Sequence, residues 1–308
     1  MKDMHAISET AIARPAPARR GALLWVLGVA VLLGLVYLPL VIWLSRTGMV
    51  VSQLTTGGVL VLFALWICLQ DVIRRHPLEP NTSDYGFSLL GVAFVLMAAA
   101  LYLKPLALPL VLVSFCCAVA AVVSFLFGRD GARRMVPALG TIFVFGMMAA
   151  LVPTLDWPLR ALAARYAAGL IQTLGVPVQL ALEVGRAPQL LLIVAGHRFV
   201  VATECNGFGL LSSALLLAVF LAFQYRMPWW RKLGIILLAL PVAIGCNFFR
   251  IVSISLFAPR IPLPYMLVHE VLGLIFYYAG LGLIWAATHR YRLEKNALAT
   301  TPVADPVD

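Results

Sequence analysis

Three polar residues stand out in an otherwise apolar sequence: Cys205, Arg250 and His269. Cys205 follows Glu204 and precedes Asn206-Gly207, a polar break directly before an apolar run. This position predicts a cysteine at the N-terminus of a helix, where the helix dipole favours the nucleophilic thiolate and water has access. The alternative is an interfacial cysteine that only fills space.

Arg250 lies inside an apolar run, seven residues before the predicted end of that run at Phe257. An arginine in a membrane span costs roughly 2.5 to 3.5 kcal/mol on insertion scales and usually marks a functional site. Here it would lie about 10 Å below the surface, which favours a buried contact or a wet cavity over snorkelling. His269 stands one turn into the last apolar run. Taken alone, it could equally be a hydrogen-bonded interface residue.

The three side chains together suit acyl transfer to a cysteine. A thiolate at Cys205 would attack a peptide carbonyl, Arg250 would donate to the developing oxyanion, and His269 would pass a proton to the leaving amine. We expect no cofactor. A zinc site is disfavoured because a cysteine and a histidine are fewer ligands than zinc usually takes, and an arginine beside a cation is unfavourable.

Membrane-spanning helices must position these residues. The chain of 308 residues is 62% hydrophobic and 12% charged, about half the charge of an ordinary soluble domain, which leaves no room for a sizeable soluble domain. A span needs about 20 mainly apolar residues. The sequence therefore predicts an all-α polytopic membrane protein of about eight spans, at 22–44, 51–73, 87–103, 105–128, 135–155, 207–224, 233–257 and 265–288.

The distribution of Lys and Arg predicts the orientation. Fifteen of the 23 fall in the two tails and one set of loops, seven fall in the other set, and the last is Arg250. Both termini are therefore predicted to be cytoplasmic, with the three polar residues near the non-cytoplasmic face of the cell (inner) membrane. Because the basic residues are scattered between apolar runs, no nucleic-acid partner is expected.

The predicted outer segment 156–206 is the only long stretch not apolar enough to span. From Trp157 to Leu174, apolar residues at helical spacing predict an amphipathic helix in the membrane interface. These residues are Leu159, Leu162, Tyr166, Leu170 and Leu174. From Gln189 to Thr203, two β-branched runs flank a turn that contains Gly196, which predicts a short β-hairpin leading to Cys205.

The predicted organisation is a cytoplasmic tail at 1–20, a transmembrane domain at 21–290 and a second cytoplasmic tail at 291–308. The first apolar run, from Gly21, is too long for a signal peptide, so we expect it to be retained. The other cysteines lie in apolar runs, where a free cysteine behaves as a small hydrophobic side chain. They are Cys68, Cys116, Cys117 and Cys246.

These motifs resemble those of the exosortase/archaeosortase family of integral membrane, transpeptidase-like enzymes. The matching parts are Glu204-Cys205-Asn206-Gly207 opening one span, Asn247-Phe248-Phe249-Arg250-Ile251 within the next, and His269-Glu270 opening the last. Their order, spacing and sidedness match the family's Cys, Arg and His motifs. Many members have a small residue before the cysteine and Ser-Gly or Thr-Gly after it, so the subfamily and its sorting signal stay open.

The resemblance implies a cysteine peptidase or transpeptidase in which Cys205, Arg250 and His269 are catalytic. Its substrates would be secreted proteins with a C-terminal sorting signal, made of a short motif such as Pro-Glu-Pro, a transmembrane helix and a basic cluster. It also implies a genomic setting of extracellular polysaccharide production. Four neighbouring residues are candidates for supporting roles: Asn247, Glu204, Asn206 and Glu270.

Two other functions are compatible with the sequence. In a transporter, Arg250 would line a substrate path and Cys205 would be incidental, but transporters often show internal repeats with a site near the midplane, and no repeat is visible here. A non-catalytic membrane component of a polysaccharide synthesis or export system would tolerate Cys205→Ala. The sequence carries no signal for an oligomeric state.

Overall fold

A computed structural model describes residues 16–50, 52–80, 83–183, 189–201, 206–225 and 227–300. This part of the chain is mostly helical, with one small sheet. The helices are α1 (Ala16–Val50), α2 (Ser52–Arg75), α3 (Asp84–Tyr102), the short 3-10 helix η1 (Lys104–Leu106), α4 (Ala107–Thr173), α5 (Phe208–Gln224), α6 (Trp229–Phe257) and α7 (Tyr265–Thr300). The strands are β1 (Val178–Glu183), β2 (Gln189–Val194) and β3 (His197–Val200).

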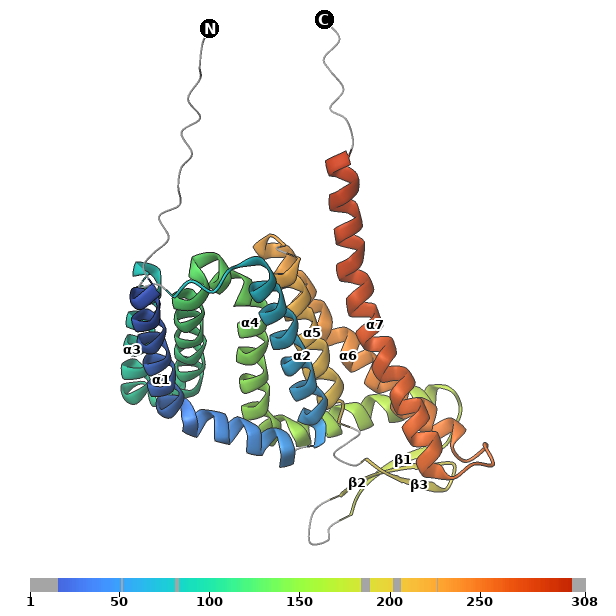
Figure 1. The fold of residues 1–308 in the computed structure, drawn as a ribbon. Coiled ribbons are helices and arrows are strands. Elements are labelled where there is room, and N and C mark those ends of the chain that lie inside the picture. Colours follow the sequence, from blue (N-terminus) through green and yellow to red (C-terminus); the bar gives the residue numbers. More distant parts are fainter. Residues whose placement is uncertain are drawn as a thin grey trace, which may run out of the picture.

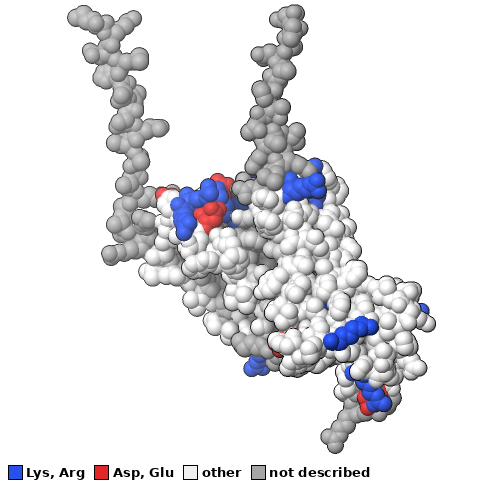
Figure 2. Space-filling view, turned by 90° about the vertical axis from the view of Figure 1, so that its right-hand side faces the viewer, with Lys and Arg blue, Asp and Glu red and all other residues white. Residues whose placement is uncertain are grey.

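The helices run back and forth between two ends of a bundle (Figure 1). The three strands lie at one end, which we call the sheet end, and the start of α1 and the end of α7 lie toward the other, which we call the opposite end. Figure 2 shows the Lys, Arg, Asp and Glu side chains gathered toward these two ends, with an uncharged band between them. This is the surface expected of a protein that spans a bilayer.

Helix α4 contains two of the predicted spans, 105–128 and 135–155. It is assigned as one helix of 67 residues, but Gly128 within it has φ 74° and ψ −178°, which no α-helix allows. The chain reverses there, so α4 forms two limbs that lie beside each other and then turns toward the sheet (Figure 1). A glycine suits this reversal because it has no Cβ to clash at positive φ.

Six described helices are long and apolar enough to cross a membrane by length and composition: α1, α2, α3, α4 with η1, α6 and α7. Helix α5 is apolar but has only 17 residues. The chain is thus a multi-pass membrane protein, and the count of eight spans stays a prediction that depends on counting α5 and both limbs of α4.

Helix α5 forms the centre of the bundle. It contacts α2, α4, α6 and α7, and most of its side chains are buried, including Phe208, Ala214 and Leu216. A helix that is apolar on all sides must be covered on all sides, by protein or by lipid. Because the residues just before α5 carry the Cys205 motif, this central helix anchors the predicted site.

The sheet confirms the predicted hairpin and adds a strand. Strands β2 and β3 pair antiparallel around Ala195-Gly196, which both have positive φ, 49° and 87°. Positive φ at both central residues is the mark of a type I′ hairpin turn, which matches the twist of the strands. β1 pairs antiparallel with β2 and was not predicted, although Val178, Leu180 and Leu182 alternate with more polar residues.

The residues predicted as an amphipathic helix, Trp157–Leu174, form the last part of α4, which ends at Thr173. Ile171 and three alanines pack against the sheet and α6, and the small size of the alanines allows close approach; the alanines are Ala164, Ala167 and Ala168. From the predicted stripe, Leu162, Tyr166 and Leu174 are exposed. The large apolar side chains therefore face away from this core, as they would in a helix that lies against lipid.

The predicted domain limits stay a prediction, and the first and last helices cross them. α1 begins at Ala16 and α7 continues to Thr300, so helix extends beyond the predicted limits at 20 and 290. The last turns of α7 lie at the opposite end of the bundle (Figure 1). The predicted tails are thus partly continuations of the first and last helices.

Candidate active site

Arg250 and His269 meet between α6 and α7. The Nη2 atom of Arg250 lies 3.4 Å from Nε2 of His269, and both residues are half-buried. Nineteen residues separate them in the chain, so the contact depends on tertiary packing. The structure thus brings together two of the three residues predicted to be catalytic.

The ends of the two helices explain this contact. α6 ends at Phe257 and α7 begins at Tyr265, so a short connection at the sheet end makes the two helices neighbours. His269 follows one turn into α7, and Arg250 lies about two turns before the end of α6. The guanidinium can therefore reach the imidazole without leaving the helix interface.

Gly273, one turn after His269, lets the guanidinium approach α7 closely. A Cβ atom at this position would lie 3.3 Å from both Nε and Nη2 of Arg250. That distance is tighter than an ordinary van der Waals contact, so the arginine lies directly against the helix backbone. Gly273 was not among the predicted site residues, although a glycine four residues after a candidate histidine was an available signal.

An aromatic row connects the sheet with His269. The Phe199 ring, on β3, lies 6.1 Å from the Tyr265 ring, and the Tyr265 ring lies 5.9 Å from the imidazole. These separations fall within the range of favourable aromatic pairs. The row limits the orientations of the imidazole and ties it to the sheet.

The pair faces a cavity of about 960 Å³, which we call the Arg–His cavity. Its walls come from α2, β3, α6 and α7, and its lining includes Thr56, Arg198, Phe199, Val200, Arg250, Tyr265, His269, Glu270, Gly273 and Tyr277. Glu270 is exposed. The cavity is large enough for several residues of a peptide, and it exposes a cationic donor and a proton-transfer group to whatever enters.

Cys205 and Glu204 lie outside the described residues, and the description resumes at Asn206. The Asn206 side chain is buried, with 3% exposure. Its Oδ1 accepts a hydrogen bond from the Phe208 backbone N–H at 2.7 Å, and its Nδ2 donates to Asp156 Oδ1 at 2.5 Å. Asp156 also pairs with Arg160. The residue after Cys205 is therefore fixed to both α4 and α5.

Asn206 is thus held in place by hydrogen bonds to α4 and to the first residue of α5. The pairing of Asp156 with Arg160 was not predicted, although an acidic and a basic residue four apart on a helix are a signal for an ion pair. This pair follows directly after the predicted span 135–155, and both side chains are largely buried, where an isolated charge would be costly. It gives the start of α5 a polar anchor inside an apolar bundle.

Asn247 lies against the start of α5. It is 4% exposed, and a Cβ atom at Gly207 would come within 2.6 Å of its Cγ and Nδ2 atoms. Gly207 also has φ +77°, so both its conformation and its neighbour require glycine. This contact brings the chain just after Cys205 to within one turn of Arg250 on α6.

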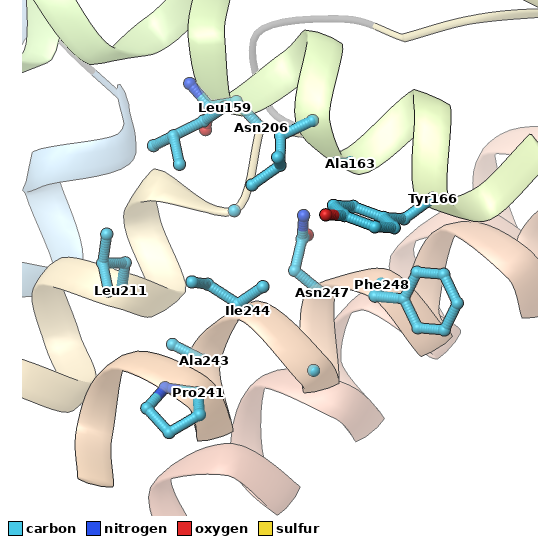
Figure 3. Close-up of a pocket in the computed structure, with 13 residues that line it drawn as sticks. Leu159, Ala163, Tyr166, Asn206, Leu211, Pro241, Ala243, Ile244, Asn247 and Phe248 are labelled. Atoms are coloured by element: carbon cyan, nitrogen blue, oxygen red, sulfur yellow. The ribbon is translucent and has the colours of Figure 1, made fainter. Parts of the chain in front are cut away.

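Asn247 lines a second cavity, of about 420 Å³, formed by α4, α6 and the start of α5. Figure 3 shows Asn247 and Tyr166 pointing toward one another inside it, with Asn206 above. The other lining residues are mainly apolar, including Leu159, Leu211, Ile244 and Phe248. Asn247 lines this second cavity, and Arg250, one turn later on α6, lines the Arg–His cavity. The two cavities therefore share one turn of α6 as a wall.

The family comparison agrees with this arrangement. A model of the transmembrane exosortase family matches residues 43–286, a range that contains every candidate site residue. No curated protein and no solved structure matches the chain. A match over this much of the chain shows the family, and the chain belongs to the transmembrane exosortases.

Proposed function

We propose that this membrane-embedded sorting enzyme is a cysteine peptidase or transpeptidase that cleaves a C-terminal sorting signal of secreted proteins. Cys205 is the nucleophile, His269 the acid and base, and Arg250 the group that stabilises the oxyanion. The observation that carries the proposal is the 3.4 Å contact between Arg250 and His269 beside a cavity of peptide size.

The contacts at the start of α5 support a role for Cys205. Asn206, its neighbour in the chain, is anchored by Asp156 and the Phe208 N–H, and Gly207 touches Asn247. A nucleophile must be held within about 0.5 Å of its productive position, because misplacement by about 1 Å can cost 100-fold in rate. The buried anchor supplies this kind of rigidity to the chain that follows the cysteine.

The proposed reaction has two steps. In the first, the Cys205 thiolate attacks the scissile carbonyl, a thioester forms, the C–N bond breaks, and protonated His269 gives its proton to the leaving amine. In the second, neutral His269 takes a proton from water or from an acceptor nucleophile, which attacks the thioester and releases the thiolate. Arg250, which is half-buried, donates to the oxyanion in both steps.

The proposal also fits a substrate that is anchored in the membrane. The Arg–His cavity extends along α7 from Tyr265 to Tyr278, so it continues from the sheet end down the bundle. A substrate with a motif followed by a transmembrane helix would place the motif at the sheet end and its helix beside α7. The proposed location is the cell (inner) membrane, with this end facing out of the cytoplasm.

The test is processing of a secreted protein from the same genome that bears a candidate signal. Cys205→Ala, Arg250→Ala and His269→Ala are each expected to abolish conversion of the precursor on an immunoblot. Glu183→Gln, an exposed change on β1, serves as the matched polar control and should retain activity. Normal processing by all three variants would refute the proposal and favour a non-catalytic membrane component.

A further inference from the structure

The sheet has an edge that no described strand covers. The strand order is β1-β2-β3, so β3 pairs with β2 on one side only. An open edge presents unpaired backbone N–H and C=O groups and readily accepts another extended segment. The position of this edge relative to Arg250 and His269 decides what it could bind.

The ladder shows which groups of β3 face outward. In an antiparallel pair, residues alternate between those bonded to the partner strand and those pointing away from it. The Val201 N–H donates to Leu190 O at 2.8 Å, and Phe199 and His197 follow at steps of two opposite β2. The backbone groups of Arg198 and Val200 therefore point toward the open edge.

The same two residues line the Arg–His cavity. Arg198, Phe199 and Val200 form one of its walls, and Arg250 and His269 belong to the same cavity. Four residues of strand extend about 13 Å, which is enough to hold three or four residues of a peptide. Figure 1 shows β3 beneath the first turns of α7, where His269 lies.

We propose that β3 binds an extended segment of the protein substrate as a fourth strand, and that this pairing sets the scissile peptide beside Arg250 and His269. The inference rests on the proposed function and identifies how that site holds its substrate. Main-chain hydrogen bonds to Arg198 and Val200 provide the binding, as in other cases of strand addition to a sheet edge.

Two features favour a peptide over other occupants. The outward groups of β3 alternate donor and acceptor, which matches an extended backbone and no lipid tail. The strand is also rigid, because Phe199 packs against the core formed by α4, α6 and the sheet and its ring lies near Tyr265. A rigid edge loses less conformational entropy when a peptide binds. The aromatic row connects this edge to the imidazole of His269.

The first test removes one outward donor. Val200→Pro deletes the N–H that faces the edge and leaves the bonds to β2 in place, since proline is tolerated on edge strands. Processing is expected to fall at least tenfold, and Val200→Ala, which keeps the N–H, should lose less. Leu182→Pro is the matched control: Leu182 lies on β1, the other edge, and its N–H also points away from β2 by the same alternation. It should process normally.

The second test reads binding without catalysis. A photo-crosslinking amino acid at position 200 or 182 is placed in a His269→Ala background, with the substrate co-expressed. Crosslinks to the substrate from 200 and not from 182 support the inference. If the otherwise wild-type enzyme processes this substrate but 200 gives no crosslink, the strand-addition model is wrong and the proposed function stands.

The remaining outcomes are also decisive. A crosslink from 200 to a second copy of the enzyme would mean that the edge is a dimer interface and would overturn the inference. Crosslinks to substrate without any processing by the wild type would support the edge and contradict the proposed function. Neither crosslinking nor processing would refute both.

Discussion

Among the described residues, an arginine meets a histidine at each end of the bundle. At the sheet end, Arg250 Nη2 lies 3.4 Å from His269 Nε2. At the opposite end, Arg134 Nε donates to His76 Nε2 at 3.1 Å. The two pairs share their residue types and have similar separations, so their surroundings must distinguish what each can do.

The pair at the opposite end belongs to a network of charges. Arg134 also bonds Asp71 at 2.8 Å, and Asp71 bonds Arg75 at 2.5 Å. The cavity beside them, of about 570 Å³, is lined by further basic residues, Arg133 and Lys232. Figure 2 shows blue and red side chains together at this end. Such a network is typical of the surface of a membrane protein outside the bilayer, where basic residues help to determine its orientation.

The pair at the sheet end has a different environment. Its arginine lies against the backbone of Gly273, its histidine lies beside the Tyr265 ring, and an open strand edge borders the same cavity. An arginine–histidine contact is therefore not a site by itself. Two features distinguish the pair that we propose to be catalytic. The edge of β3 borders its cavity, and the chain directly after Cys205 is held in place nearby.

The largest difference between the two pairs is expected when the arginine of each is replaced by alanine. Arg250→Ala is expected to lower processing by about 100- to 1,000-fold, the usual effect of losing one oxyanion donor, and Arg250→Lys should not restore it, because an ammonium lacks the planar fork. Arg134→Ala should lower processing less than about tenfold. The measurement is the initial rate in membranes with matched enzyme amounts. Equal losses for the two alanine variants would break the comparison.

The backbone at the start of α5 gives the next largest effect. Gly207 and Gly175 both have φ +77°, but a Cβ at Gly207 would strike Asn247, whereas one at Gly175 would meet nothing within 4 Å. Both alanine variants incur a conformational cost of about 1 to 2 kcal/mol. Only Gly207→Ala should also lower processing, by tenfold or more. Normal activity of Gly207→Ala would show that the anchor beside Cys205 is not needed.

A methyl group next to the guanidinium sharpens the comparison further. Gly273→Ala would place a Cβ 3.3 Å from Arg250, whereas Gly282→Ala, on the same helix, would meet nothing within 4 Å. We expect a several-fold loss of processing for the first, on the order of the effect of a small misplacement, and none for the second. Identical rates for the two variants would place the guanidinium farther from α7 than the structure does.

The smallest effect is expected from the hydrogen bond that joins Tyr277, on the cavity wall, to Ser213 on α5. The Tyr277 hydroxyl donates to Ser213 Oγ at 2.8 Å, and Tyr277 lines the cavity. Tyr277→Phe should lower the free energy of unfolding by about 1 kcal/mol and change processing little. Tyr278→Phe, whose side chain is 65% exposed, is the control. Thermal unfolding in detergent compares them, and equal stabilities would argue that the bond contributes nothing.

The sequence predicted much of the fold because hydrophobic length is a strong signal in a membrane protein. The apolar windows locate the helices, and the β-branched runs around Gly196 locate the hairpin. Two features of α4 were not predicted. The helix continues without a break from the predicted span 135–155 into the amphipathic part, and small residues form most of the packing face of that part. Alanines such as Ala164 and Ala167 form that face, and a pattern based on large apolar residues does not detect small ones.

Within the site, the sequence brought Arg250 and His269 to the same end, since residue counts along a helix give depth directly. Asp156 and Gly273 were missed because their importance comes from tertiary neighbours, Asn206 and Arg250. Asn247 was only a candidate for a supporting role, and the structure places it in the second cavity against Gly207. Which face of a helix meets which partner depends on packing that spacing does not encode.

The most direct measurement of the central claim is whether Cys205 becomes acylated. Purified enzyme is mixed with substrate, quenched in acid, and digested for mass spectrometry, with Cys205→Ala in parallel. The account predicts a substrate-derived adduct on the peptide that contains Cys205, labile to hydroxylamine as a thioester is, and neither adduct nor cleavage in the variant. Cleavage by Cys205→Ala at the wild-type rate, or an adduct on a different residue, would contradict it.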